Sequence, residues 1–258
     1  MPRFAANLSM MFNEVPFLDR FKAAADAGFK GVEFLFPYEH PKEEMKRRLD
    51  EHGLEIALFN MPPGDFEKGE RGLAALKGRE EEFERGIHRA LDYAKTLGCL
   101  RVHAMAGLRQ GGADRATYIN NLAKAARAFA PHAIDVLIEP INPRDIPGYF
   151  LNRTAEAKSI IDAVGASNLK LQLDLYHRQI VEGDLVQAIT EYADVTAHIQ
   201  IASPPDRGEP DDGEINYLFI FQTLDKMGYK GWVGCEYRPR RGTREGLVWL
   251  SKLSSSHY

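Results

Sequence analysis

Four side chains that can bind a metal ion stand at the ends of short apolar segments in the second half of the chain. They are Glu139 after Val136-Leu-Ile, Asp174 after Leu171-Gln-Leu, Gln200 after Ala197-His-Ile, and Glu236 after Val233-Gly-Cys. Successive members are 35, 26 and 36 residues apart, and each interval is about the length of one βα unit. Three carboxylates and one amide oxygen suit Mg²⁺ or Mn²⁺ better than zinc. The sequence therefore predicts a site for one divalent metal ion, Mg²⁺ or Mn²⁺.

The recurrence of these groups favours a metal site over a structural role. A single Asp or Glu at the end of a strand is more often a cap or an ion-pair partner. A carboxylate inside an apolar segment is costly to bury unless it is paired or bound to a metal. Packing does not explain why such a group recurs at the same point of successive βα units. We therefore expect all four side chains to converge on one centre.

The elements that must position these groups form a repeating pattern of short β-rich segments and longer amphipathic ones. The expected strands are residues 4–8, 31–36, 54–60, 100–105, 135–140, 169–175, 196–201 and 231–237, and the clearest helices are residues 15–27, 80–97, 115–129 and 154–164. Alternation alone also fits an open doubly wound sheet, but a count of eight strands favours a closed barrel. The sequence predicts one α/β domain over residues 1–258, a single (β/α)8 barrel.

In such a barrel, the loops that follow the strands lie on one catalytic face. The longest of these loops are residues 60–78, 142–152 and 202–216. The third loop contains Arg207, the one cation near Gln200 in the sequence. A guanidinium at this place can form a bidentate pair with a substrate carboxylate or pair with the acids of its own loop, and we expect the first role.

Three histidines fall on or near the same face. His177 follows Asp174 by three residues. We expect His177 to hydrogen-bond a substrate oxygen, with a role at a helix start as the alternative. His103 lies at the end of its strand and is a further candidate for substrate binding, although the sequence leaves its contact with the site open. His198 precedes Gln200 by two residues and is expected one layer deeper, as a core histidine.

Composition excludes several classes of protein. Lys and Arg total 33 against 37 Asp and Glu, and the formal charge of −4 gives no global positive field for a nucleic acid. No apolar run approaches the roughly 20 residues that a membrane-spanning helix needs. Cys99 and Cys235 lie in apolar segments, so we expect buried thiols and a cytoplasmic protein. The sequence does not fix the oligomeric state, and a homo-oligomer is compatible with it.

Several segments together resemble the hydroxypyruvate isomerase family. They are Glu139-Pro, Asp174-Leu-Tyr-His, His198-Ile-Gln-Ile, Asp206-Arg-Gly-Glu-Pro-Asp-Asp-Gly-Glu-Ile-Asn-Tyr and Gly234-Cys-Glu-Tyr, with Phe4-Ala-Ala-Asn-Leu-Ser-Met-Met-Phe and Val32-Glu-Phe-Leu-Phe-Pro-Tyr near the start. The likeness runs nearly end to end, and its most specific part is the long loop together with four ligands in order. This family includes 2-oxotetronate isomerases and belongs to the xylose isomerase-like TIM barrels.

The resemblance implies one divalent ion held by Glu139, Asp174, Gln200 and Glu236, with the two glutamates also acting as the proton-transfer pair. The implied reaction is a metal-dependent isomerisation of a small hydroxy-keto acid through an enediolate. It converts hydroxypyruvate to tartronate semialdehyde, or 2-oxotetronate to 3-oxotetronate. Such a reaction needs a base, an acid and a way to stabilise negative charge, which a metal and two carboxylates supply. Which acid is the substrate, and which glutamate removes the first proton, stay open.

Other functions of related barrels fit less well. A ketose 3-epimerase resembles this chain in its metal and paired glutamates, but its seventh-strand ligand is typically histidine where this chain has Gln200. A nuclease like endonuclease IV uses three zinc ions and additional histidines, whereas the third strand here ends at Asn60. A barrel that only binds a sugar acid would be expected to lack a proton-transfer group. We therefore expect the isomerase, with the epimerase as the alternative.

Overall fold

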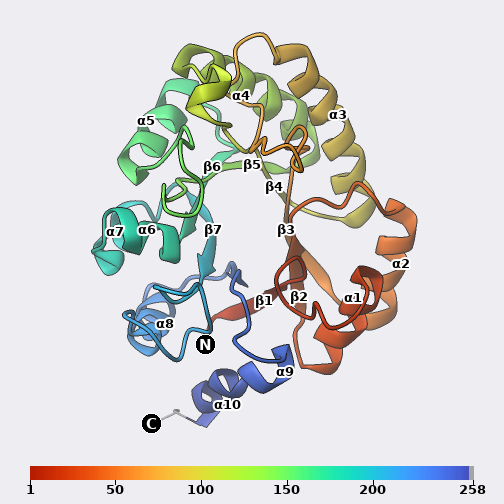
Figure 1. Ribbon diagram of the computed structural model, residues 1–258, viewed down its shortest axis with the longest axis vertical. Coiled ribbons are helices and arrows are strands. Elements are labelled where there is room, and N and C mark those ends of the chain that lie inside the picture. The colour runs from red at the N-terminus through yellow and green to blue at the C-terminus, as the bar shows by residue number, and fades with distance from the viewer. Residues whose placement is uncertain (256–258) are drawn as a thin grey trace.

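The computed structural model describes residues 1–255, and the eight strands of this range close into a parallel barrel (Figure 1). The strands are β1 (Arg3–Asn7), β2 (Gly31–Phe34), β3 (Glu55–Asn60), β4 (Arg101–His103), β5 (Asp135–Ile138), β6 (Leu169–Asp174), β7 (Thr196–Ile201) and β8 (Trp232–Cys235). Each strand pairs with the next along the chain, and β8 pairs with β1. The predicted barrel is confirmed, and every predicted strand corresponds to an observed one.

Helices surround the barrel on the outside (Figure 1). They are α1 (Phe17–Asp26), α2 (Lys42–His52), α3 (Glu80–Leu97), α4 (Arg115–Phe129), α5 (Thr154–Val164), α6 (Leu175–Val181), α7 (Leu185–Glu191), α8 (Tyr217–Lys226), α9 (Thr243–Gly246) and α10 (Val248–Ser255), with the short turns η1 (Arg109–Gly111) and η2 (Ala130–His132). The bounds of α3, α4 and α5 are as predicted. The first predicted helix begins two residues late, at Phe17, because Pro16 precedes it with an extended backbone (ψ 150°).

Polar side chains of β6 and β7 meet inside the barrel because of the two-residue repeat of a strand. Gln172 and Asp174 share one face of β6, and His198 and Gln200 share one face of β7. The register pairs Gln172 with His198 and Asp174 with Gln200. All four side chains are buried, at 2% exposure or less. The barrel interior is therefore polar toward the carboxyl ends of these strands.

The loops after β3, β4 and β5 hold one another in place at the carboxyl ends of the strands. Gly72 forms a β-bridge with Ala106, and Leu108 forms another with Tyr149. The Ala106 N–H also donates to the Tyr149 hydroxyl at 2.8 Å. A Cβ at Gly72 would lie 2.2 Å from the carbonyl oxygen of Met105, and the φ of Gly72 is +110°. Only glycine fits where these two loops meet, so the loops after β3 and β4 pack closely against each other at the catalytic face.

The cysteines behave as predicted. Cys99 and Cys235 are both buried and free in the described range. Burial raises the pKa of the Cys99 thiol to about 12, so it stays protonated and unreactive at neutral pH. Among residues 1–255, no helix has both the length and the apolar character needed to cross a membrane.

Candidate metal centre and active site

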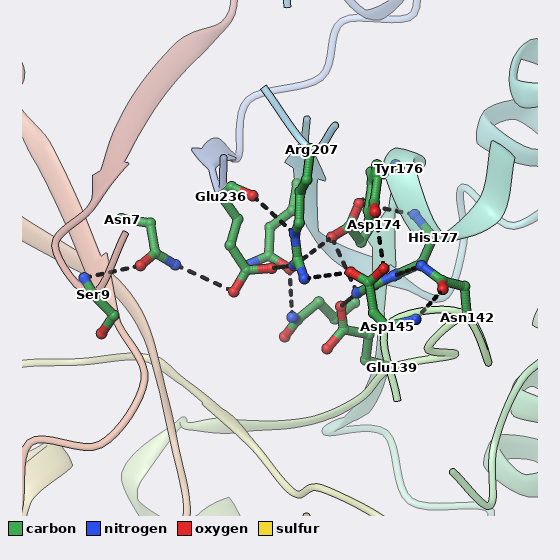
Figure 2. Close-up of polar contacts among 12 residues, drawn as sticks. Asn7, Ser9, Glu139, Asn142, Asp145, Asp174, Tyr176, His177, Arg207 and Glu236 are labelled. Atoms are coloured by element: carbon green, nitrogen blue, oxygen red, sulfur yellow. Dashed lines mark hydrogen bonds and ion pairs between the residues drawn. The ribbon is translucent and has the colours of Figure 1, made fainter. Parts of the chain in front are cut away.

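Three carboxylates meet on the catalytic face, at the ends of β5, β6 and β8 (Figure 2). Glu139 directly follows β5, Asp174 ends β6, and Glu236 directly follows β8. His177, in the first turn of α6, joins them, and one ligand atom from each of the four lies within 4.8 Å of the others. All four residues are buried, at 5% exposure or less. The structure thus brings the three predicted carboxylates together, with the predicted rim histidine beside them.

Two oxygen atoms of this cluster lack a hydrogen-bond partner in the described part of the chain. They are Oε1 of Glu139 and Oδ2 of Asp174, both shielded from solvent. A buried carboxylate oxygen without a donor is unfavourable, and a cation at the centre would satisfy both atoms. Carboxylate oxygens are the donors that Mg²⁺ and Mn²⁺ prefer. The residues present therefore fit a divalent ion of this kind.

The fourth predicted ligand, Gln200, lies next to the cluster and is connected to it by another amide. Its Oε1 accepts a hydrogen bond from Nε2 of Gln172 at 2.5 Å, and its own Nε2 donates to Oε1 of Glu33 at 2.8 Å. Gln172 also lies close enough to Glu139 to oppose the rise that burial causes in the pKa of that carboxyl group. The amide oxygen of Gln200 thus faces the group that contacts the carboxylates. Its assignment as a metal ligand stays a prediction.

Arg207 reaches into the centre from the loop after β7 (Figure 2). Its Nη2 lies 2.7 Å from Oε2 of Glu236 and 3.8 Å from Oδ2 of Asp174. Its Nη1 lies 2.9 Å from Oδ2 of Asp145. The guanidinium stands over the Tyr176 ring, 5.0 Å from its centroid, and the Tyr176 hydroxyl donates to Oδ1 of Asp145 at 2.9 Å. Arg207 therefore neutralises carboxylates of the centre rather than acids of its own loop.

The backbone of the same loop holds Arg207 in this position. Ser203 and Gly208 exchange two backbone hydrogen bonds, of 3.0 and 3.2 Å. The N–H of Arg238, two residues beyond Glu236, donates to the carbonyl of Arg207 at 2.8 Å. The φ of Arg207 is +57°, a left-handed conformation that costs energy for a residue with a side chain. The strained backbone of Arg207 thus directs its guanidinium at the carboxylates.

Burial raises the pKa values of the three carboxyl groups. For Glu139, burial raises the pKa well above its usual value, and the charges of Glu236 and Asp174 raise it further. Burial raises the pKa of Glu236 to about 8, against the opposing effect of Arg207. Burial also raises the pKa of Asp174, although Arg207 and backbone N–H groups at the start of α6 oppose this. Without a cation, the centre does not keep all three groups ionised near neutral pH.

The two histidines of the site are neutral. Burial, aided by the charge of Arg207, lowers the pKa of His177 well below its usual value, and burial lowers that of His103 to about 3. Nδ1 of His177 lies 2.6 Å from Nδ2 of Asn142, so Nδ1 accepts from the amide and Nε2 carries the proton. Nε2 in turn lies 3.8 Å from Oε1 of Glu139. This tautomer presents an N–H to the centre, which suits a hydrogen bond to a substrate oxygen better than metal ligation.

His103 lies on the other side of Glu139. Its Nδ1 is 3.6 Å from Oε2 of Glu139, and its side chain is 1% exposed. Neither ring nitrogen has a hydrogen-bond partner within residues 1–255. The structure thus places His103 at the centre, as a buried neutral group with unused hydrogen-bonding capacity.

Sequence reasoning missed the polar side chains that support the centre. They are Asn7, Glu33, Asn142, Asp145, Gln172 and Tyr176. Glu33 carries the same signal as the predicted ligands, because it is an acid inside an apolar segment. Gln172 precedes Asp174 by two residues and must share its face of β6. Asn142 and Asp145 come from a loop, whose course the strand pattern does not predict.

Comparison with known proteins agrees with this architecture. Residues 21–253 match the family described as xylose isomerase-like TIM barrel. The 2-oxo-tetronate isomerase of Cupriavidus necator is 59% identical, over 97% of this chain and 98% of its own length. The hydroxypyruvate isomerase of Escherichia coli is 48% identical, over 97% of this chain and 98% of its own length. A crystal structure described as AP endonuclease, family 2, from Brucella melitensis has a TM-score of 0.95 at 53% identity, covering 98% of this chain and 99% of that one. This chain belongs to the xylose isomerase-like TIM barrel family.

Proposed function

We propose that this protein is a metal-dependent isomerase of a small hydroxy-keto acid, acting on hydroxypyruvate or on 2-oxo-tetronate. The observation that carries the proposal is the pair of buried carboxyl groups, Glu139 and Glu236, that share one centre with Asp174. Relatives named 2-oxo-tetronate isomerase and hydroxypyruvate isomerase match over nearly their whole length. Both observations support proton transfer between neighbouring carbons of such an acid.

The reaction requires groups that remove and return protons. In hydroxypyruvate, a base removes a proton from the hydroxymethyl carbon, and the electron pair forms the C=C bond of an enediolate. A proton then returns to the former carbonyl carbon, while the hydroxyl proton passes to the former carbonyl oxygen, which gives tartronate semialdehyde. A divalent ion, Mg²⁺ or Mn²⁺, would supply Lewis acidity toward the carbonyl and hydroxyl oxygens of the substrate. Its proposed ligands are Glu139, Asp174, Gln200 and Glu236.

Glu139 and Glu236 form the proposed proton-transfer pair. One accepts the proton from carbon as general base, and the other gives or accepts a proton at the neighbouring position. Their positions support this role, because both carboxyl groups are buried and share one centre with Asp174. The N–H of His177 faces the same centre and is proposed to hydrogen-bond a substrate oxygen, with His103 as a further contact.

Arg207 is the proposed partner of the substrate carboxylate. Its side chain is 13% exposed and directed at the centre, and its planar guanidinium matches a carboxylate with two parallel hydrogen bonds. Its present partners are the carboxylates of Glu236 and Asp145. With a cation held by Glu236, the guanidinium would no longer be needed to neutralise that carboxylate, and one edge of Arg207 could bind the substrate carboxylate.

An NMR assay in D2O tests the proposal. Hydroxypyruvate and 2-oxo-tetronate are each incubated with wild type and with Glu236→Gln, in Mg²⁺ or Mn²⁺ and in a chelator. We expect metal-dependent conversion with deuterium incorporation, reduced about 10²-fold or more in the variant. The faster substrate identifies the preferred acid. Folded, metal-loaded wild type that neither converts nor exchanges either acid would overturn the proposal and favour ketose 3-epimerisation.

The site does not favour a nuclease, despite the description of one solved relative. Its cluster contains one histidine, His177, beside three carboxylates. The formal charge of −4 provides no global field to collect a phosphate backbone. We therefore propose no second function.

A further inference from the structure

Glu33 lies at the middle of a polar layer one level deeper in the barrel than the metal centre. Its side chain is 1% exposed and extends from β2 across the interior to β7. Oε2 lies 2.7 Å from Nε2 of His198. Oε1 accepts from Nε2 of Gln200 at 2.8 Å and from Nδ2 of Asn7 at 3.0 Å. Three donors from two other strands thus converge on this one carboxylate.

Glu33 determines which end of the Gln200 amide faces the centre. Because the carboxylate takes the N–H of Gln200, the amide oxygen points the other way, where Gln172 donates to it. An amide turned over would place its oxygen against a carboxylate, and two acceptors cannot bond each other. The carboxylate therefore leaves Oε1 of Gln200 as the atom available to a cation.

Glu33 also acts on Glu236, through Asn7. Nδ2 of Asn7 donates to Oε1 of Glu33 at 3.0 Å and to Oε1 of Glu236 at 3.3 Å. Oδ1 of Asn7 accepts from the N–H of Ser9 at 3.0 Å, so this amide is held at both ends (Figure 2). The position of Glu236 is thus connected to Glu33 by a single, fully bonded side chain.

The barrel leaves space for Glu33 by means of a glycine. Gly234 precedes Glu236 by two residues on the same face of the chain. A Cβ at Gly234 would lie 2.2 Å from Oε2 and 2.5 Å from Oε1 of Glu33. Any side chain at this position displaces the carboxylate from its three donors, although it removes no bonding group.

We propose that Glu33 is a positioning residue of the metal centre, which presents an oxygen of Gln200 and an oxygen of Glu236 to the ion by fixing the amides of Gln200 and Asn7. The inference rests on the proposed function, in which Gln200 and Glu236 are ligands. A carboxylate that only filled the barrel core would affect the stability of the fold and leave the affinity for the ion unchanged.

The test is an EPR titration of the metal-free, full-length protein with Mn²⁺, alongside its thermal unfolding in chelator. Glu33→Ala removes the acceptor, and Gly234→Ala displaces it. Glu33→Gln keeps an oxygen for the two amides, while its N–H₂ group faces His198, which accepts by moving its proton to the other ring nitrogen. The control is Glu182→Gln, which changes a carboxylate outside the barrel. The Glu182 side chain is 13% exposed and accepts a hydrogen bond from the N–H of Thr154, at the start of α5.

We expect both alanine variants to bind Mn²⁺ about 10- to 100-fold more weakly than wild type. Glu33→Gln should stay closer to wild type than Glu33→Ala, and Glu182→Gln should be unchanged. If Glu33→Ala does not fold, Gly234→Ala and Glu33→Gln decide between the outcomes. Folded Gly234→Ala with wild-type affinity overturns the inference, and so does a Glu33→Gln variant as weak as Glu33→Ala. Wild type that does not bind Mn²⁺ refutes the metal centre itself, which is a separate result.

Discussion

Replacing Arg207 with Gln should destabilise the metal-free protein. The guanidinium is 2.7 Å from Glu236 and 2.9 Å from Asp145, and its side chain is only 13% exposed. At about pH 9, where Glu236 with its pKa of about 8 is ionised, breaking this largely buried ion pair costs about 3–5 kcal/mol, because the remaining charge stays buried without a partner. In a protein of this size, each kcal/mol lowers the Tm by about 2–4 °C. We therefore expect the Tm of Arg207→Gln in chelator to be about 6–20 °C below that of wild type.

Mn²⁺ should reduce this difference, because the ion replaces the positive charge that the substitution removes. Thermal unfolding is followed by circular dichroism in EDTA and in Mn²⁺ at about 100 times the wild-type Kd, a concentration that adds about 2.7 kcal/mol to wild type and more to a variant that binds the ion more tightly. Arg47→Gln is the control, because Arg47 also contacts two carboxylates but is 55% exposed, so no measurable change is expected. If Arg207→Gln unfolds at the wild-type temperature in EDTA, Arg207 is not the countercharge of the centre.

Three further predictions follow from the same site. Because burial raises the pKa of Glu236 from 4.5 to about 8, the folded metal-free protein retains a proton that the unfolded chain has lost. Its stability should therefore fall as pH rises between these two values. Urea midpoints in EDTA check this, and an equal fall in Glu236→Gln would assign it to another group. Glu139→Gln should lower kcat by about 10²–10⁴-fold, as measured by NMR in D2O. If the variant exchanges deuterium into the substrate without converting it, Glu139 only returns the proton. Asn142→Ala removes the hydrogen bond that sets the tautomer of His177, so kcat/KM should fall up to about tenfold. An unchanged kcat/KM would show that the tautomer does not depend on Asn142.

The positions of Glu139, Asp174 and Glu236 could be predicted because they depend only on chain order in a closed barrel. Each lies at the end of a short apolar strand, and the ends of parallel strands meet on one face. The same reasoning placed Gln200 beside them, but it could not show which atom of its amide faces the centre. That depends on Glu33, which comes from the opposite side of the barrel.

The loop residues required information that a strand pattern does not contain. Arg207 was expected to bind substrate, but its contact with Asp145 joins two loops that are 62 residues apart in the chain. The partner of His177 is another example, since Asn142 lies in the loop after β5 and sets the tautomer of a ring carried by α6. Such contacts follow from loop conformation, which local sequence periodicity leaves undetermined.

The pairing of β1 with β8 has a consequence for the synthesis of the protein. Asn7 donates to Glu236 across 229 residues of chain, so the first strand and the last complete the same site. The amino-terminal part of a chain leaves the ribosome first, and it must wait with an unpaired β1 edge until β8 arrives. An ion at this centre would therefore be a ligand of the finished barrel and not of the nascent chain. Its binding energy would be added only when the barrel closes, so it would favour the last step of assembly and would not stabilise prematurely terminated chains.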